Sequence, residues 1–166
     1  MKKKNLYLVG GILFVVLVVF FLTSAVKGSQ SLDKFGEEMT IYKTSTCGCC
    51  EVYTSYFKSK GSSNVNVITI PDNTRFMEEH KIPSFLESCH TTIVGKYFVE
   101  GHVPIEAITK LLTEQPDIDG ITLPGMPAGT PGMPGTKSGP WVVYGLKDGK
   151  VSDFLTIWLR KNNYIL

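Results

Sequence analysis

An uncharged run at residues 6–26 limits what this chain can fold into more than any other feature of its sequence. The run follows three consecutive lysines, and about 20 apolar residues are enough to span the hydrocarbon core of a bilayer. Its length favours an uncleaved membrane anchor over a cleaved signal peptide, whose apolar core has about 7–15 residues. Because positive residues stay in the cytoplasm, we expect residues 28–166 to lie outside it, either anchored to the membrane or soluble after cleavage.

The rest of the chain has the size and charge of one ordinary domain. We predict a signal anchor at 1–27, a polar tether at 28–38 and a folded domain at 39–166, long enough to bury a core without disulfides. The whole chain has a net charge of +2, but without the four lysines that flank the apolar run it has 13 basic and 15 acidic residues. A domain this close to neutrality has no basic surface for phosphate groups, which disfavours nucleic acids and anionic lipids as partners.

The predicted elements follow a recognisable order. A strand at 39–44, a helix at 51–60 and a strand at 65–70 come first. Then follow short helices at 73–80 and 83–89, two strands at 91–94 and 97–100 around a turn, and a helix at 104–112. This order of β-α-β, a helical insertion and β-β-α predicts an α/β, thioredoxin-like fold.

The C-terminal part adds to this unit. Residues 116–140 are dense in proline and glycine and contain the near-repeat PGMP, so we predict no regular structure there. Residues 141–146 and 150–158 flank the turn at 147–149 and predict a hairpin that extends or covers the sheet.

The four cysteines occur in only two places, Cys47-Gly48-Cys49-Cys50 and Cys89. A pair of structural disulfides is one interpretation for an exported chain. Because Cys47, Cys49 and Cys50 are so close together, at most one bond from them could reach Cys89. Disulfides stabilise most when they close long loops, so this interpretation explains the spacing poorly.

A second interpretation starts from the position of Cys47 between the first predicted strand and helix. Unpaired amide groups and the helix dipole lower the pKa of a thiol at such a place, and Cys50 returns to the same side of the first turn. Cys47-x-x-Cys50 is therefore spaced as a redox dithiol. The loop before the next strand carries Cys89-His90 where such folds usually have a proline, which favours metal binding over disulfide exchange.

The ligand types decide which metal is expected. Thiolates with imidazole select Cu(I) or Zn(II), and three cysteines within four positions suit several bridged Cu(I) ions better than one zinc tetrahedron. Further candidates are His102, which follows a strand, and Met126, whose thioether suits Cu(I). Met133 can equally be a loop residue over an apolar patch, and His80 on a charged helix is expected to be solvated.

Four ordered motifs give the chain a family resemblance: CGCC at 47–50, SCHT at 88–91, EGHVP at 100–104 and PGMP at 124–127. From about residue 39 to residue 146 the chain resembles a family of small exported bacterial proteins of unknown function that includes CopG-type copper-resistance proteins.

This resemblance implies a thioredoxin-like fold that holds copper as a cysteine-bridged multinuclear cluster. It further implies conversion between Cu(I) and Cu(II) during copper detoxification, together with copper-efflux or other copper-resistance proteins. The implied metal ligands are Cys47, Cys49, Cys50, Cys89 and His90. His102 and Met126 also match family motifs, as ligands or as groups that support the ligands.

Two other functions fit the same residues. A thiol-disulfide oxidoreductase would use Cys47 as the attacking thiol, Cys50 as the resolving thiol and Cys89 as an auxiliary thiol. A non-redox carrier would pass Cu(I) to an efflux partner or bind zinc. Since these functions share their ligands, the sequence leaves open whether the protein is an enzyme.

Overall fold

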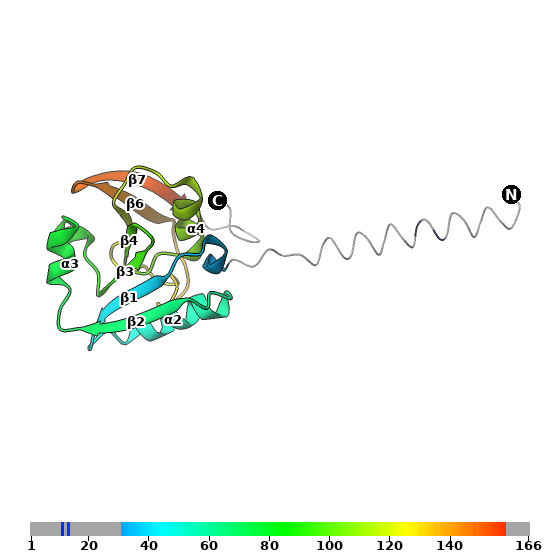
Figure 1. Ribbon diagram of the computed structural model, residues 1–166, viewed down its shortest axis with the longest axis horizontal. Helices are drawn as coiled ribbons and strands as arrows, with labels where there is room; N and C mark the ends of the chain where they lie inside the picture. Colours follow the sequence, from blue (N-terminus) through cyan, green and yellow to red (C-terminus); the bar gives the residue numbers. More distant parts are fainter. Residues whose placement is uncertain (1–10, 12, 14–30, 159–166) are drawn as a thin grey trace, which may run out of the picture.

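The computed structural model describes residues 11, 13 and 31–158, which include one seven-stranded mixed sheet and several short helices (Figure 1). The strands are β1 (Met39–Thr44), β2 (Val65–Ile70), β3 (His90–Val94), β4 (Tyr97–Glu100), β5 (Gly120–Thr122), β6 (Trp141–Lys147) and β7 (Lys150–Ile157). The described helices of 31–158 are η1 (Leu32–Phe35), α2 (Cys49–Ser59), α3 (Thr74–Glu79), η2 (Ser84–Leu86) and α4 (Ile105–Glu114).

The strand order is β2-β1-β3-β4-β5-β6-β7. Strands β1 and β2 pair in parallel through the crossover helix α2, and so do β4 and β5 through α4. The other neighbouring strands are antiparallel. The fold is therefore mixed α/β, as expected, and the C-terminal hairpin extends the sheet rather than covering it.

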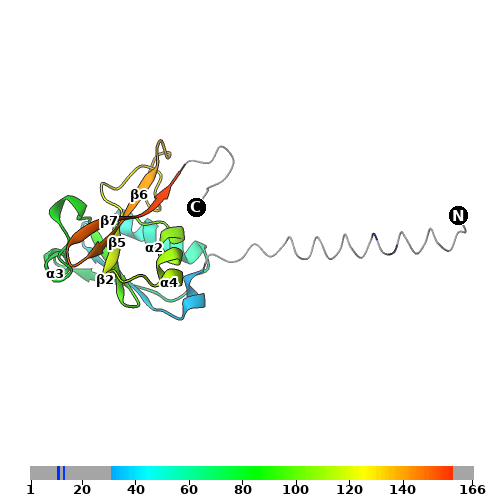
Figure 2. The same cartoon turned by 90° about the horizontal axis from the view of Figure 1, so that it is seen from above.

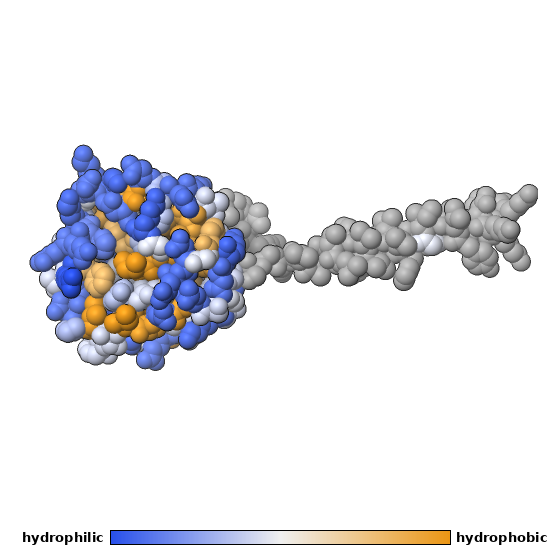
Figure 3. All heavy atoms as spheres, viewed as in Figure 1, coloured by the Kyte–Doolittle hydropathy of each residue, from blue (hydrophilic) through white to orange (hydrophobic). Residues whose placement is uncertain are grey.

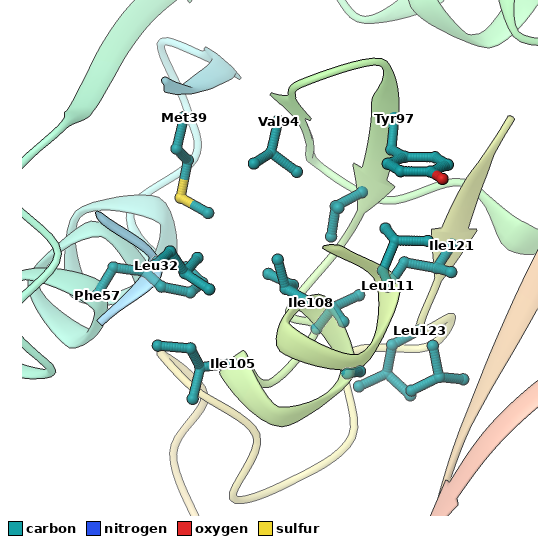
Figure 4. Close-up of a cluster of buried hydrophobic side chains, with 14 of the residues drawn as sticks. Leu32, Met39, Phe57, Val94, Tyr97, Ile105, Ile108, Leu111, Ile121 and Leu123 are labelled. Carbon is teal, nitrogen blue, oxygen red and sulfur yellow. The ribbon is translucent and has the colours of Figure 1, made fainter. Parts of the chain in front are cut away.

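Side chains alternate between two apolar clusters on the two faces of the sheet. The larger cluster includes residues of the sheet and of helices α2 and α4, whose places can be followed in Figure 2. Its members include Met39, Phe57, Val94, Ile108 and Ile121, all buried (Figure 4). A smaller cluster lies on the opposite face of the sheet. It contains residues of α3 and η2 together with strand residues such as Phe98 of β4. Strand β4 is thus buried on both faces, as its position near the middle of the sheet requires.

The structure changes three expectations about local structure. Helix α2 begins at Cys49 rather than at residue 51, so two cysteines lie in its first turn. The helix expected at 83–89 is only the three-residue η2. Strand β5 lies inside the segment predicted to be irregular. A three-residue strand lacks a detectable period of its own and forms because β4 and β6 flank it.

Part of the segment expected to be a tether packs onto the domain. Leu32 of η1 is 4% exposed and belongs to the larger cluster. The carboxylate of Asp33 accepts hydrogen bonds from the backbone N–H and the hydroxyl of Ser63, which lowers the pKa of Asp33. Packing of the domain therefore includes η1 as well as the predicted 39–166.

The predicted anchor at 6–26 lies outside the described residues, apart from Gly11 and Leu13. Within the described part of the chain, no helix has the length and apolar character needed to cross a membrane. The face of the domain in Figure 3 is mostly hydrophilic, with small separate apolar patches.

Candidate metal centre

The cysteines of the first group lie where β1 ends and α2 begins. Cys47 is in the turn after β1, where its N–H donates to the carbonyl of Thr44. Cys49 and Cys50 open α2, whose exposed amide groups at this end favour negative charge. Cys47 and Cys50 are joined by a disulfide and are almost completely buried, whereas Cys49 is a half-buried free thiol.

Cys89 reaches this group from the loop before β3. Its Sγ lies 3.1 Å from Sγ of Cys47 and 3.7 Å from Sγ of Cys49, and it is a half-buried free thiol. Antiparallel pairing of β3 with β1 places the next residue, His90, opposite Lys43 near the end of β1. The sheet therefore brings together four sulfur atoms from two parts of the chain 40 residues apart.

Two imidazole rings lie close to these sulfur atoms. His90 and His102 are fully buried, their ring centroids are 4.9 Å apart, and Tyr53 of α2 contacts both rings. The Tyr53 hydroxyl donates to the carbonyl of Val103, which fixes this aromatic ring beside the two histidines. The site therefore combines four sulfur atoms, two of them on half-buried thiols, with two buried imidazole rings.

Both histidines have a ring nitrogen without a partner in the described structure. Nε2 of His90 and Nε2 of His102 are both buried, and neither atom donates or accepts a hydrogen bond within the described residues. Burial lowers the pKa of His90 to about 3, with a smaller contribution from His102, and it also lowers the pKa of His102. Neutral imidazole is the form that ligates metals, so the unpartnered nitrogens fit a metal site.

The ligand atoms form two overlapping groups. One atom from each of Cys47, Cys50, Cys89 and His90 lies within 4.8 Å of the others, and the same holds for Cys49, Cys89 and His102. Cys89 is common to both groups. The two groups therefore share one sulfur atom, and each offers the thiolate and imidazole ligands that bind soft metals.

The environment of Cys89 favours a metal role over a nucleophilic one. Burial, followed by the neighbouring Cys49, raises the pKa of Cys89 to about 11. In the metal-free protein this thiol therefore keeps its proton at neutral pH, and a protonated thiol is a poor nucleophile. A bound cation would replace that proton and offset the cost of burying a negative sulfur.

The proline- and glycine-rich loop closes over the other side of the site. The carbonyl of Pro131 lies 2.7 Å from Nδ1 of His102. Gly132, at φ +84°, packs so tightly that a Cβ there would lie 3.0 Å from the Tyr53 nitrogen and 3.1 Å from both the Cys49 carbonyl oxygen and Nδ1 of His102. Only a residue without a side chain can pass this close.

The remaining candidates from the sequence lie farther from these contacts. Met126 is 40% exposed on the same loop, and none of the contacts described above includes it. Met133 is half-buried beside Gly132. The ring of His80 packs against Phe98 with centroids 4.9 Å apart, so His80 contacts the smaller apolar cluster, whereas the sequence predicted a solvated side chain.

One important residue was not identified as a site residue from the sequence. Glu100 is completely buried at the end of β4, where its carboxylate accepts hydrogen bonds from the Ser88 N–H and the Thr91 hydroxyl. Burial raises its pKa to about 8, although these hydrogen bonds act in the opposite direction. Glu100 thus holds the loop that carries Cys89, and its signals in the sequence are its place in the EGHVP motif and its charge at the end of an apolar strand.

Comparisons with known proteins support a metal-related site. The family model "Protein of unknown function, DUF411" matches residues 86–133, which include Cys89, His90 and His102. The solved structure "Copper resistance protein copG", Form 2, is 32% identical, with a TM-score of 0.65 over 72% of this chain and 97% of that chain. Form 1 is 30% identical, with a TM-score of 0.61 over 72% and 95%. No curated protein sequence matches the chain.

Proposed function

Because the chain belongs to the DUF411 family that includes CopG-type copper-resistance proteins, we propose that it binds copper and acts in copper resistance. In this proposal the reduced protein holds more than one Cu(I) ion, bridged by the thiolates of Cys47, Cys49, Cys50 and Cys89. His90 supplies an imidazole ligand, and His102 is a further ligand at the edge of the site. Met126 is a candidate thioether ligand from the loop.

The observation that carries the proposal is that Cys89 belongs to two ligand groups at once. A single ion cannot use all six groups of this site, because soft metals bind two to four ligands. Two groups that share one thiolate can instead hold neighbouring ions. Thiolate and imidazole ligands prefer Cu(I) and zinc to metals that favour oxygen.

The disulfide suggests how the site could change the valence of copper. Oxidation of the Cys47 and Cys50 thiols to the disulfide releases two electrons and two protons, and reduction of two Cu(II) ions to Cu(I) takes up two electrons. The two half-reactions balance with no other redox partner. We therefore propose that copper and disulfide chemistry are coupled here, in support of a copper oxidoreductase rather than a simple carrier.

The same disulfide supports a second candidate function. In a thioredoxin-like arrangement, Cys47 and Cys50 at the start of α2 would exchange disulfides with other proteins. The order β2-β1-β3-β4 with α2 between β1 and β2 supports that fold assignment. This candidate predicts that Cys89→Ser retains reductase activity and that Cys47→Ser abolishes it.

The proposed setting follows from the sequence. We place the domain on the extracytoplasmic face of the bacterial inner membrane, held by residues 6–26, or in the periplasm if this run is cleaved. Copper-efflux or other copper-resistance proteins would then receive or deliver the ions.

An anaerobic titration of Cu(I) into the reduced full chain tests the proposal. The protein is kept in detergent because of its apolar run, and a chelator of known affinity competes for the ion. We expect more than one Cu(I) per chain to be held against the chelator, and Zn(II) in a parallel titration to reach a lower stoichiometry. The copper proposal fails if neither metal is retained, and one zinc ion with no copper preference would indicate a zinc protein.

A further inference from the structure

We propose that the disulfide form of this protein keeps a separate site for one Cu(I) ion, made by Cys49, Cys89 and His102. The oxidation state of Cys47 and Cys50 would then set how many copper ions the protein holds. This inference rests on the proposed copper function and assigns different parts of the site to its two redox forms.

The two ligand groups respond differently to the disulfide. In the group of Cys47, Cys50, Cys89 and His90, the disulfide removes two of the four ligands, because a disulfide sulfur is not a thiolate. The group of Cys49, Cys89 and His102 loses none, since both of its cysteines are free. One complete ligand set therefore remains in the oxidised protein.

The spacing of this second group suits a single soft ion. Two sulfurs about 2.3 Å from a common ion, at a trigonal angle, lie about 4 Å apart. The Sγ atoms of Cys49 and Cys89 are 3.7 Å apart, so they can hold one ion with little movement. The Sγ atoms of Cys47 and Cys89, at 3.1 Å, are closer together than this arrangement requires.

His102 has a ring nitrogen available as a third ligand. A carbonyl oxygen only accepts hydrogen bonds, so the contact with Pro131 places the proton of His102 on Nδ1 and leaves the lone pair on Nε2. Nε2 is buried and has no partner in the described structure. Histidine ligands commonly donate their second N–H to a backbone carbonyl, as His102 does here.

The two groups also differ in their access to solvent. Cys49 and Cys89 are half-buried, whereas Cys47 is 4% exposed and Cys50 and His90 are completely buried. An ion arriving from solvent therefore meets the half-buried thiols of Cys49 and Cys89 before the fully buried His102 and the other ligands. A thiol reductant, supplying two electrons and two protons, would open the disulfide and make the buried ligands available.

The test titrates Cu(I) anaerobically into two forms of the full chain in detergent, against a competing chelator. One form carries the disulfide, verified as two free thiols per chain, and the other is fully reduced and freed of reductant. We expect one Cu(I) per chain in the disulfide form and more in the reduced form. In the disulfide form, His102→Ala should weaken binding by at least about tenfold, since loss of a group that merely supports a ligand already costs 10–100-fold.

Two further variants keep the test decisive. His80→Ala is the matched control, since the His80 ring packs against Phe98 of the smaller apolar cluster, and it should change neither stoichiometry nor affinity. The double variant Cys47→Ser, Cys50→Ser removes the same two ligands without a disulfide and should still bind one Cu(I), even if His102→Ala does not fold. Zero ions in the disulfide form and in the double variant, or unchanged binding in folded His102→Ala, would overturn the inference. If the reduced form also bound none, the proposed function itself would fail.

Discussion

Cys89→Ser is expected to reduce the Cu(I) held by the reduced protein to one ion per chain or fewer. Cys89 is the one residue present in both ligand groups, so its loss removes the bridge between them. Serine keeps the size of the side chain but offers a hard hydroxyl, which binds Cu(I) poorly. The measurement is the chelator titration of the reduced full chain, compared with the unchanged protein.

Ser55→Ala is the control for Cys89→Ser. Ser55 lies on α2, the helix that Cys49 and Cys50 open, and its side chain is exposed, so removal of its hydroxyl should leave copper binding intact. Unchanged stoichiometry in Cys89→Ser would contradict a shared ligand. Intact disulfide reductase activity in the same variant would then favour the oxidoreductase function, in which Cys89 is dispensable.

Glu100→Gln is expected to stabilise the metal-free protein strongly at alkaline pH. The pKa of Glu100 is about 8 in the folded protein, against 4.5 as its ordinary value. Between these values the folded state binds more protons than the unfolded state, so stability falls by about 1.4 kcal/mol per pH unit as the pH rises. The penalty is absent below pH 4.5 and complete above pH 8, where it amounts to roughly 5 kcal/mol.

Glutamine suits the same place because it can reproduce both hydrogen bonds. Its carbonyl can accept from the Ser88 N–H, and its amide can donate to the Thr91 hydroxyl, which can in turn donate to Asn73. Free energies of unfolding, measured with a chelator present, should be similar for the two proteins at pH 5. At pH 8.5 they should differ by several kcal/mol in favour of the variant.

A surface carboxyl provides the comparison for this pH effect. Glu79 forms only an exposed ion pair with Arg75, so Glu79→Gln should change stability by less than about 1 kcal/mol at either pH. If Glu100→Gln showed the same flat difference, Glu100 would not be the buried acid that the structure indicates.

Much of the fold was predictable because its signals are local. The β-branched run at 65–70 and the apolar face of α4 correspond to elements with nearly the predicted bounds. Strand β5 was missed because only its neighbours in the sheet stabilise it. Leu32 lies in a polar segment, and its burial depends on Ser62, whose hydroxyl accepts a hydrogen bond from the Leu32 N–H.

The candidate site was predictable to a similar degree. The order of elements was enough to predict that Cys89 and His90 approach Cys47, because β3 pairs beside β1. The position of His102 near Cys49 and Cys89 depends on its contact with the loop at 123–140. The sequence of this loop has no periodic pattern from which its path could be predicted. Tyr53 was recognised only as an apolar helix residue, since its contact with two histidines is a tertiary feature.

X-ray absorption at the copper edge of the reduced full chain, loaded with Cu(I) and freed of excess metal, tests the central claim most directly. The proposed site predicts an edge typical of Cu(I), a first shell dominated by sulfur, and scattering between neighbouring copper ions that share thiolates. A spectrum without copper–copper scattering, or a first shell dominated by oxygen and nitrogen, would contradict a cysteine-bridged copper cluster.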